Sequence, residues 1–175
     1  LQKLKKRFIL MSNAPRPSKN VEKFLLKLKM KKIFTKKIFT SGEAALKSLK
    51  QEKYGKNFYH LGPKRDISLF QDFVQNKKNL ENADFILCTG LLENHENSLD
   101  FYNKLLKNYT RLKLICTNPD LIVHRGDKKE YCAGSIAEIF KKLGGKVIYF
   151  GKPHPEIYRY CTKKDETVLV IGDNI

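Results

Sequence analysis

The sequence lacks any apolar run of the roughly 18–20 residues that a membrane-spanning helix requires. It also lacks internal repeats, low-complexity tracts and a phosphate loop of the G-x-x-x-x-G-K type. The four cysteines lie far apart without a C-x-x-C pair, and the four histidines show no zinc-like spacing. These absences argue against a membrane helix, a repeat protein, a P-loop nucleotide-binding protein and a zinc module.

Acidic residues are scarce, with 18 Asp and Glu against 35 Lys and Arg, for a net charge of +17. Such a balance permits a nucleic-acid or other anionic partner. However, 29 of the cations are lysine and only six are arginine, the residue that specific phosphate and base contacts favour. We therefore interpret the charge first as a solvated surface, with a nucleic-acid surface as the alternative.

The chain has 175 residues, of which 41% are hydrophobic. This length and composition predict one folded domain, or a core with a moderate insertion. Cys88 and Cys116 sit inside apolar runs, which indicates reduced core thiols and a reducing, cytoplasmic location rather than a disulfide.

Short apolar runs alternate with segments of helical spacing along the whole chain, which predicts an α/β fold with a parallel sheet. Predicted helices include one after Thr40-Ser41-Gly42-Glu43, a capping-box spacing, and another that ends at Gly144-Gly145. The predicted strands cover residues 8–11, 38–39, 57–61, 85–89, 112–117, 147–150 and 168–171.

Polar residues follow three of these strands, at the position where open α/β sheets bind ligands. Ser12 and Asn13 follow residues 8–11, and they offer a hydroxyl and backbone amides to a phosphate. Lys152 lies in the rigid loop Gly151-Lys152-Pro153-His154-Pro155, where a fixed ammonium can neutralise a phosphate. Asp173 follows residues 168–171, and a carboxylate there suits Mg²⁺.

Each of these signals has an ordinary alternative when it is taken alone. Ser12-Asn13 and Gly172-Asp173 are also typical of simple turns, and Lys152 is one lysine among 29. Asp66, after Gly62-Pro63, is interpreted as a helix N-cap.

Taken in order, these motifs resemble the haloacid-dehalogenase-like hydrolases with a large α/β cap. That group includes p-nitrophenyl-phosphatase-like enzymes and the sugar phosphatases of N-acetylglucosamine catabolism. The resemblance implies a Rossmann-like parallel-sheet core with an inserted α/β cap domain. Residues 1–41 and 145–175 would form the core, and residues 42–144 the cap.

The resemblance also implies roles for individual residues. Ser12 would bind the transferring phosphoryl group, with a backbone amide from Asn13 beside it. Lys152 would pair with both the phosphoryl group and a nucleophilic aspartate, and Asp173 would bind Mg²⁺. The reaction would hydrolyse small phosphate monoesters through an aspartyl-phosphate.

The resemblance further implies substrate contacts and partners. Asn118 and Asp120 match an Asn-Pro-Asp segment near the junction of cap and core, where they would contact substrate. The expected partner is a small phosphorylated metabolite, with a homodimer through the cap, and without a membrane or nucleic acid.

The chain departs from the family pattern at its first motif. No Asp-x-Asp lies upstream of Ser12, and the chain ends before the acidic residue that usually follows Gly-Asp-Asn. We therefore expect a chain truncated at both ends, without the first strand of its core and catalytically inactive as given. The alternatives are a non-catalytic module that binds phosphorylated ligands and a basic nucleic-acid-associated protein.

Overall fold

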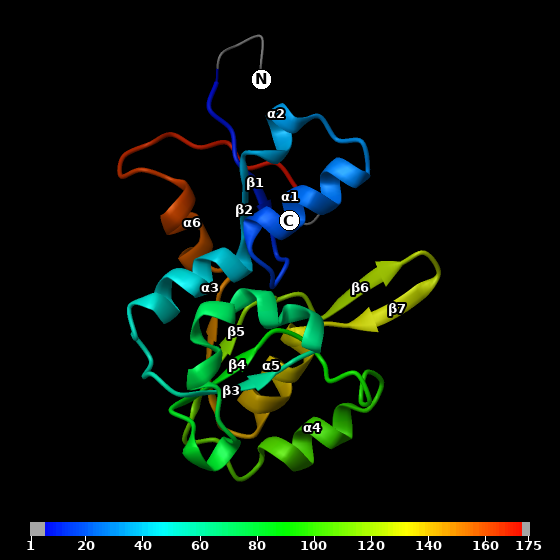
Figure 1. The fold of residues 1–175 in the computed structure, drawn as a ribbon, viewed down its shortest axis with the longest axis vertical. Coiled ribbons are helices and arrows are strands. Elements are labelled where there is room, and N and C mark those ends of the chain that lie inside the picture. The colour runs from blue at the N-terminus through cyan, green and yellow to red at the C-terminus, as the bar shows by residue number, and fades with distance from the viewer. Residues whose placement is uncertain (1–5, 173–175) are drawn as a thin grey trace.

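Three small sheets and their flanking helices make up the computed structural model, which describes residues 6–172 (Figure 1). β1 (Leu10–Ser12) and β2 (Ile38–Thr40) pair in parallel, with Ser12 opposite Thr40. β3 (Phe58–Leu61), β4 (Phe85–Cys88), β5 (Lys113–Cys116) and β8 (Lys146–Tyr149) form a parallel sheet in the order β3-β4-β5-β8. The predicted α/β class with a parallel sheet is confirmed.

The remaining elements connect and cover these strands. The α-helices are α1 (Ser18–Lys27), α2 (Lys32–Thr35), α3 (Ser41–Lys50), α4 (Leu99–Leu106), α5 (Ala133–Lys142) and α6 (Pro155–Cys161). Three 3₁₀ helices are η1 (Lys64–Leu69), η2 (Gln71–Asn76) and η3 (Leu80–Asn82). β6 (Ile122–Arg125) and β7 (Lys128–Tyr131) form an antiparallel hairpin that projects from the body of the molecule (Figure 1).

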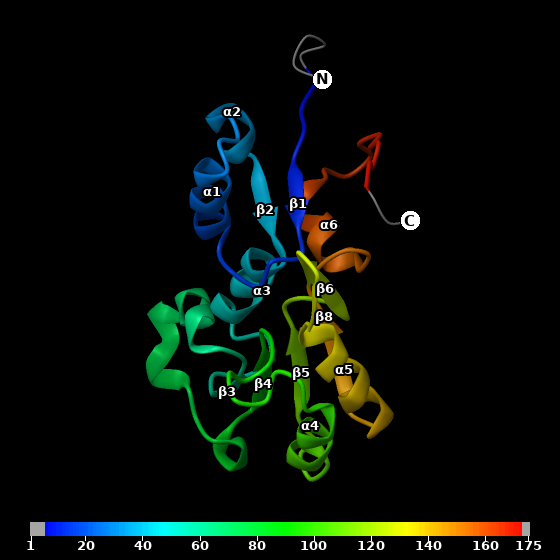
Figure 2. The ribbon, with the colours of Figure 1, turned by 90° about the vertical axis from the view of Figure 1, so that its right-hand side faces the viewer.

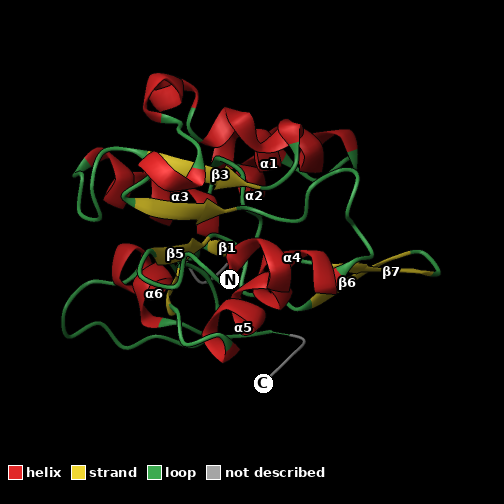
Figure 3. Ribbon diagram, turned by 90° about the horizontal axis from the view of Figure 1, so that it is seen from below, coloured by secondary structure: helices red, strands yellow, loops and turns green. Residues whose placement is uncertain are grey.

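The four-stranded sheet is buried on both faces because its strands alternate between two hydrophobic clusters. Ile86 and Cys88 of β4 enter the cluster that α4 and α5 cover, whereas Phe85 and Leu87 enter the cluster that includes Ala44 of α3. In Figure 3 the strands accordingly lie between α3 on one side and α5 on the other. Continuous apolar runs therefore predicted these strands correctly, since a strand covered on both faces has no polar side.

The two parallel sheets lie one above the other, as Figure 2 shows, and β8 belongs to the larger of them. Cys116 of β5 is paired with Tyr149 of β8. The prediction that assigned residues from 145 onward to the core is therefore wrong for β8, because an apolar strand does not specify which sheet it joins. The division into a core and a cap is otherwise a prediction still.

Three local predictions differ from the structure, and one hairpin was not predicted. Residues 168–171 form no strand, and Leu169 and Ile171 are at least 80% exposed, because an apolar strand needs a neighbour and the described residues provide none. The hairpin β6–β7 was missed, although its two-residue Gly126-Asp127 turn is a hairpin signal. The sequence also predicts a helix over residues 67–74, but these residues form 3₁₀ turns in place of an α-helix. Asp66 lies inside η1, so it is not an N-cap.

Helix α3 begins as predicted, and its start also fixes the loop after β1. The backbone N–H of Glu43 donates to the Thr40 hydroxyl (3.0 Å), and that of Gly42 donates to the carbonyl of Ala14 (3.1 Å). A Cβ on Gly42 would lie 2.5 Å from the carbonyl carbon and oxygen of Pro15. Only glycine lets the loop and the helix approach this closely.

We predict that Gly42→Ala destabilises the protein, although alanine is the better helix former. The added methyl group meets backbone rather than a movable side chain, so the free energy of unfolding should fall by about 2 kcal/mol. Urea unfolding measures this change. Lys50→Ala, at an exposed position of the same helix, is the control and should change it little; a Gly42→Ala protein as stable as that control would contradict the packing argument.

Candidate functional site

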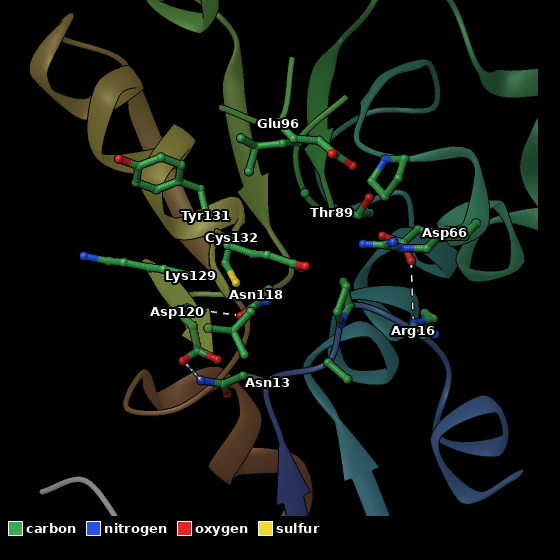
Figure 4. Close-up of a pocket in the computed structure, with 18 of the residues that line it drawn as sticks. Asn13, Arg16, Asp66, Thr89, Glu96, Asn118, Asp120, Lys129, Tyr131 and Cys132 are labelled. Atoms are coloured by element: carbon green, nitrogen blue, oxygen red, sulfur yellow. Dashed lines mark hydrogen bonds and ion pairs between the residues drawn. The ribbon is translucent and has the colours of Figure 1, made fainter. Parts of the chain in front are cut away.

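A cavity of about 580 Å³ opens where the loops after β1, β3, β4 and β5 meet (Figure 4). Ser12 ends β1 and residues 13–16 follow it, Asp66 lies beyond β3, Thr89 follows β4, and Asp120 lies beyond β5. These loops all leave the carboxyl ends of parallel strands, where α/β sheets bind ligands. The cavity is therefore the candidate functional site.

Asn13 holds two distant loops together at one side of this cavity. Its Oδ1 accepts from the backbone N–H of Lys152 (2.7 Å), and its Nδ2 donates to the carbonyl of Lys152 (3.1 Å). Nδ2 also donates to Oδ1 of Asp120 (2.8 Å), the bond drawn in Figure 4. We call this arrangement of Asn13, Asp120 and the Lys152 backbone the amide clamp. It brings together three segments that the sequence motifs had singled out.

The other predicted site residues lie as follows. Ser12 lines the cavity, and its hydroxyl accepts from the backbone N–H of Ala14 (3.2 Å). Asn118 also lines it, and its Oδ1 accepts from the backbone N–H of Asp120 (3.1 Å). Lys152 enters the site through its backbone, and its side chain is not among those that line the cavity. Asp173 lies outside the described residues. The roles of all six residues remain predictions.

A buried polar chain forms another side of the cavity, and the motifs did not predict it. His60 Nε2 lies 2.9 Å from the Thr89 hydroxyl, and Thr89 in turn acts on the Asp66 carboxyl by lowering its pKa. Because a hydroxyl has one proton, Thr89 accepts from His60 when it donates to Asp66. Beyond Asp66 lies Arg16, with its Nε 3.7 Å from Oδ1 of that carboxylate.

Burial controls the charge of these groups. It raises the pKa of Asp66, and the nearby Arg16, the Thr89 hydrogen bond and Arg65 act in the opposite direction. Burial also lowers the pKa of His60 to about 4, with the charge of Lys77 adding to the effect. His60 is therefore neutral at pH 7.

Two thiols of the four-stranded sheet, Cys88 and Cys116, are not activated. Burial raises the pKa of Cys116 to about 12 and raises that of Cys88 as well. A thiol needs its thiolate form to act as a nucleophile, so these two cysteines pack in the sheet. All four cysteines lie in the described part of the chain, are buried and form no disulfide, as expected.

The described residues do not fit a Mg²⁺ site. Residues 6–172 contain no group of three or more His, Cys, Asp or Glu side chains that could hold a metal ion. Asp120, the carboxylate nearest the amide clamp, already accepts a hydrogen bond from Asn13. We therefore derive no step through a metal ion.

Within residues 6–172, no helix is both long enough and apolar enough to span a bilayer.

The structure resembles solved haloacid-dehalogenase-like hydrolases. One such hydrolase, from Brucella suis 1330, superposes with a TM-score of 0.78 at 28% identity, over 87% of this chain and 56% of its own. The p-nitrophenyl phosphatase of Archaeoglobus fulgidus gives a TM-score of 0.65 at 21% identity, over 91% of this chain and 61% of its own. The 4-nitrophenylphosphatase of Thermotoga maritima gives 0.67 at 22% identity, with the same coverage.

These similarities confirm the predicted resemblance: the chain has the fold of the haloacid-dehalogenase-like hydrolases. It spans between 56% and 61% of the length of these three structures. No protein-family model matches the sequence, and a search of curated proteins gives no match.

We predict that Asn13→Asp opens the amide clamp. The substitution removes the donor to Lys152 and places a second carboxylate against Asp120, so the free energy of unfolding should fall by about 2 kcal/mol. The double variant Asn13→Asp with Asp120→Asn restores a donor opposite the new carboxylate. Urea unfolding of both single variants and the double should give a coupling of about 1 kcal/mol or more. Strictly additive effects would show that Asn13 and Asp120 do not interact.

We predict a pH effect from His60. The unfolded chain takes up a proton at this residue below pH 6.5, whereas the folded protein takes it up only near pH 4. The free energy of unfolding should therefore fall by up to about 3 kcal/mol between these pH values through this group. His60→Gln should remove that part of the pH dependence, whereas His124→Gln, on the exposed hairpin, should retain it. Parallel curves for the original protein and His60→Gln would contradict the assignment.

Proposed function

We propose that this chain is the phosphate-ester-binding part of a haloacid-dehalogenase-like phosphatase. The observation that carries the proposal is the amide clamp, which brings the loop of Ser12 and Asn13 against that of Lys152. In the family that the chain resembles, these two loops bind the transferring phosphoryl group. The named activities of the p-nitrophenyl phosphatases of similar fold support the same class of ligand.

The chemistry of the proposed site follows from charge. A phosphate monoester is an anion, and its negative charge must be offset before another carboxylate approaches phosphorus. In the proposal the Lys152 ammonium supplies the positive charge, while the Ser12 hydroxyl and the Asn13 backbone amide hydrogen-bond the phosphoryl oxygens. Asn118 and Asp120, which line the cavity together with Ser12 and Asn13, would contact the rest of the ester.

The proposal gives this chain binding and no chemistry. The family reaction needs an aspartate nucleophile from an Asp-x-Asp motif, and no such motif precedes Ser12 in the sequence. Mg²⁺ would bind at Asp173, together with ligands that residues 6–172 do not provide. The chain as given is therefore proposed to be inactive and to bind a small phosphorylated metabolite, in a reducing, cytoplasmic location that its reduced cysteines favour.

We predict that the chain binds inorganic phosphate through Lys152. Lys152→Ala should raise the dissociation constant about tenfold or more, as expected for the loss of a charge-assisted hydrogen bond. Lys146→Ala, at an exposed position in β8, removes the same charge elsewhere and should change the constant less than about twofold by general electrostatics. Isothermal titration calorimetry with phosphate at fixed ionic strength measures both.

Two results would count against the proposal. Equal effects of Lys152→Ala and Lys146→Ala would mean that phosphate binds only to the general positive charge. Hydrolysis of 4-nitrophenyl phosphate by the chain in the presence of Mg²⁺ would show that the proposed inactivity is wrong.

A further inference from the structure

Two of the six arginines of this lysine-rich chain lie in one region of the cavity. Arg16 and Arg65 both line it, and both act on the charge of Asp66. Arginine differs from lysine in its planar fork of donors, which matches a carboxylate or a phosphate in two-point contact. A chain that uses lysine for most of its positive charge thus has two arginines beside a buried carboxylate in the lining of this cavity.

The backbone of Arg16 is held in place from the side of β2 and α3. The Thr40 hydroxyl donates to the carbonyl of Arg16 (2.7 Å). A Cβ on Gly42 would come within 2.8 Å of the backbone nitrogen of Arg16, so the loop lies directly against the helix. The starting point of the Arg16 side chain is therefore fixed.

Asp66 fixes the direction of that side chain. The Asp66 side chain is 3% exposed, and its Oδ1 forms no hydrogen bond with the described residues. Nε of Arg16 is also buried and without a hydrogen bond, and the two atoms face each other at 3.7 Å (Figure 4). A buried carboxylate with an unfilled acceptor is unfavourable by itself, and among the groups that offset its burial Arg16 acts most strongly on its pKa.

The other end of the guanidinium is available to a ligand. The Arg16 side chain is 40% exposed and lines the cavity. Since Nε is directed to Asp66, the terminal pair of nitrogens is the part left for an oxyanion. In Figure 4 this group lies across the cavity from Asn13 and Asp120 of the amide clamp.

We propose that Arg16, positioned by Asp66, binds a second anionic group of the substrate, a carboxylate or a second phosphate. The inference rests on the proposed function, in which the first phosphoryl group lies at the amide clamp. The inference narrows the proposed substrate class to phosphate monoesters whose leaving group is itself anionic. Arg16 is then a specificity residue, and Asp66 is a positioning residue that acts through it.

A matched pair of ligands tests the inference on the chain as it exists. 3-Phosphoglycerate and glycerol 3-phosphate differ in a carboxylate against a hydroxymethyl group, and propane-1,3-diol bisphosphate supplies a second phosphate instead. Calorimetry at one ionic strength should give 3-phosphoglycerate or the bisphosphate a dissociation constant about tenfold or more below that of glycerol 3-phosphate. If 3-phosphoglycerate binds more tightly, the second anionic group is a carboxylate; if the bisphosphate does, it is a phosphate.

Variants then assign the preference to Arg16. Arg16→Gln should bring the ratio of the dissociation constants of glycerol 3-phosphate and the preferred ligand to about one. Arg16→Lys should reduce this ratio, because the charge stays but the fork of donors is lost. Asp66→Asn should also reduce the ratio; a merely structural loss would weaken both ligands together and leave the ratio unchanged. Arg111→Gln, which removes an exposed arginine outside the cavity lining, is the matched charge control and should retain the full ratio.

The outcomes separate the two proposals. If phosphate binds through Lys152 but the ratio is near one, or survives Arg16→Gln, the inference about Arg16 is wrong and the proposed function stands. If phosphate binding does not depend on Lys152, the proposed function fails, and the inference that rests on it fails as well.

Discussion

The contact between the Asn13 side chain and the Lys152 backbone is the interaction on which the candidate site depends. It joins residues 139 positions apart and satisfies both the N–H and the C=O of Lys152. Among side chains of this size only a primary amide both accepts and donates in this way, so a carboxylate of the same shape cannot replace it. The loop that carries Lys152 is thereby placed against the end of β1. This contact between the two loops determines where the cavity lies.

The topology of the sheets explains why one contact has this effect. β1 and β2 form one parallel pair, and β8 is the edge strand of the larger sheet. The chain leaves the carboxyl end of β8 and reaches Lys152 within three residues, directly opposite the carboxyl end of β1. The cavity thus lies between the carboxyl ends of two sheets, and the clamp connects the loops that leave them. Polar groups from separate parts of the chain meet there because strand ends meet there.

The sequence predicts those parts of the fold that depend on local pattern. Residues 85–89 and 114–117 are buried on both faces, so their apolar runs identify strands without knowledge of their neighbours. Residues 168–171 have the same pattern but form no strand, because pattern does not supply a partner. The assignment of β8 to the wrong sheet has the same cause. In the site, the sequence predicts a ligand contact for the backbone amide of Asn13, but it does not predict the contact of the Asn13 side chain with Lys152, because that contact joins residues 139 positions apart.

The arginine and its buried carboxylate show what separates a site from a charged surface in such a chain. With 35 cations, closeness to a cation carries little information, and Lys128 and Lys129 line the same cavity. Arg16 differs in its restraints: its carbonyl is bonded to Thr40, its backbone lies against Gly42, and its Nε faces Asp66. Each restraint removes conformations that a free side chain would lose on binding a ligand, so the entropic cost of ordering is lower at this residue than at the exposed lysines. Ligand recognition in a uniformly basic chain therefore depends on which cationic side chain is conformationally restrained, and composition alone does not identify that side chain.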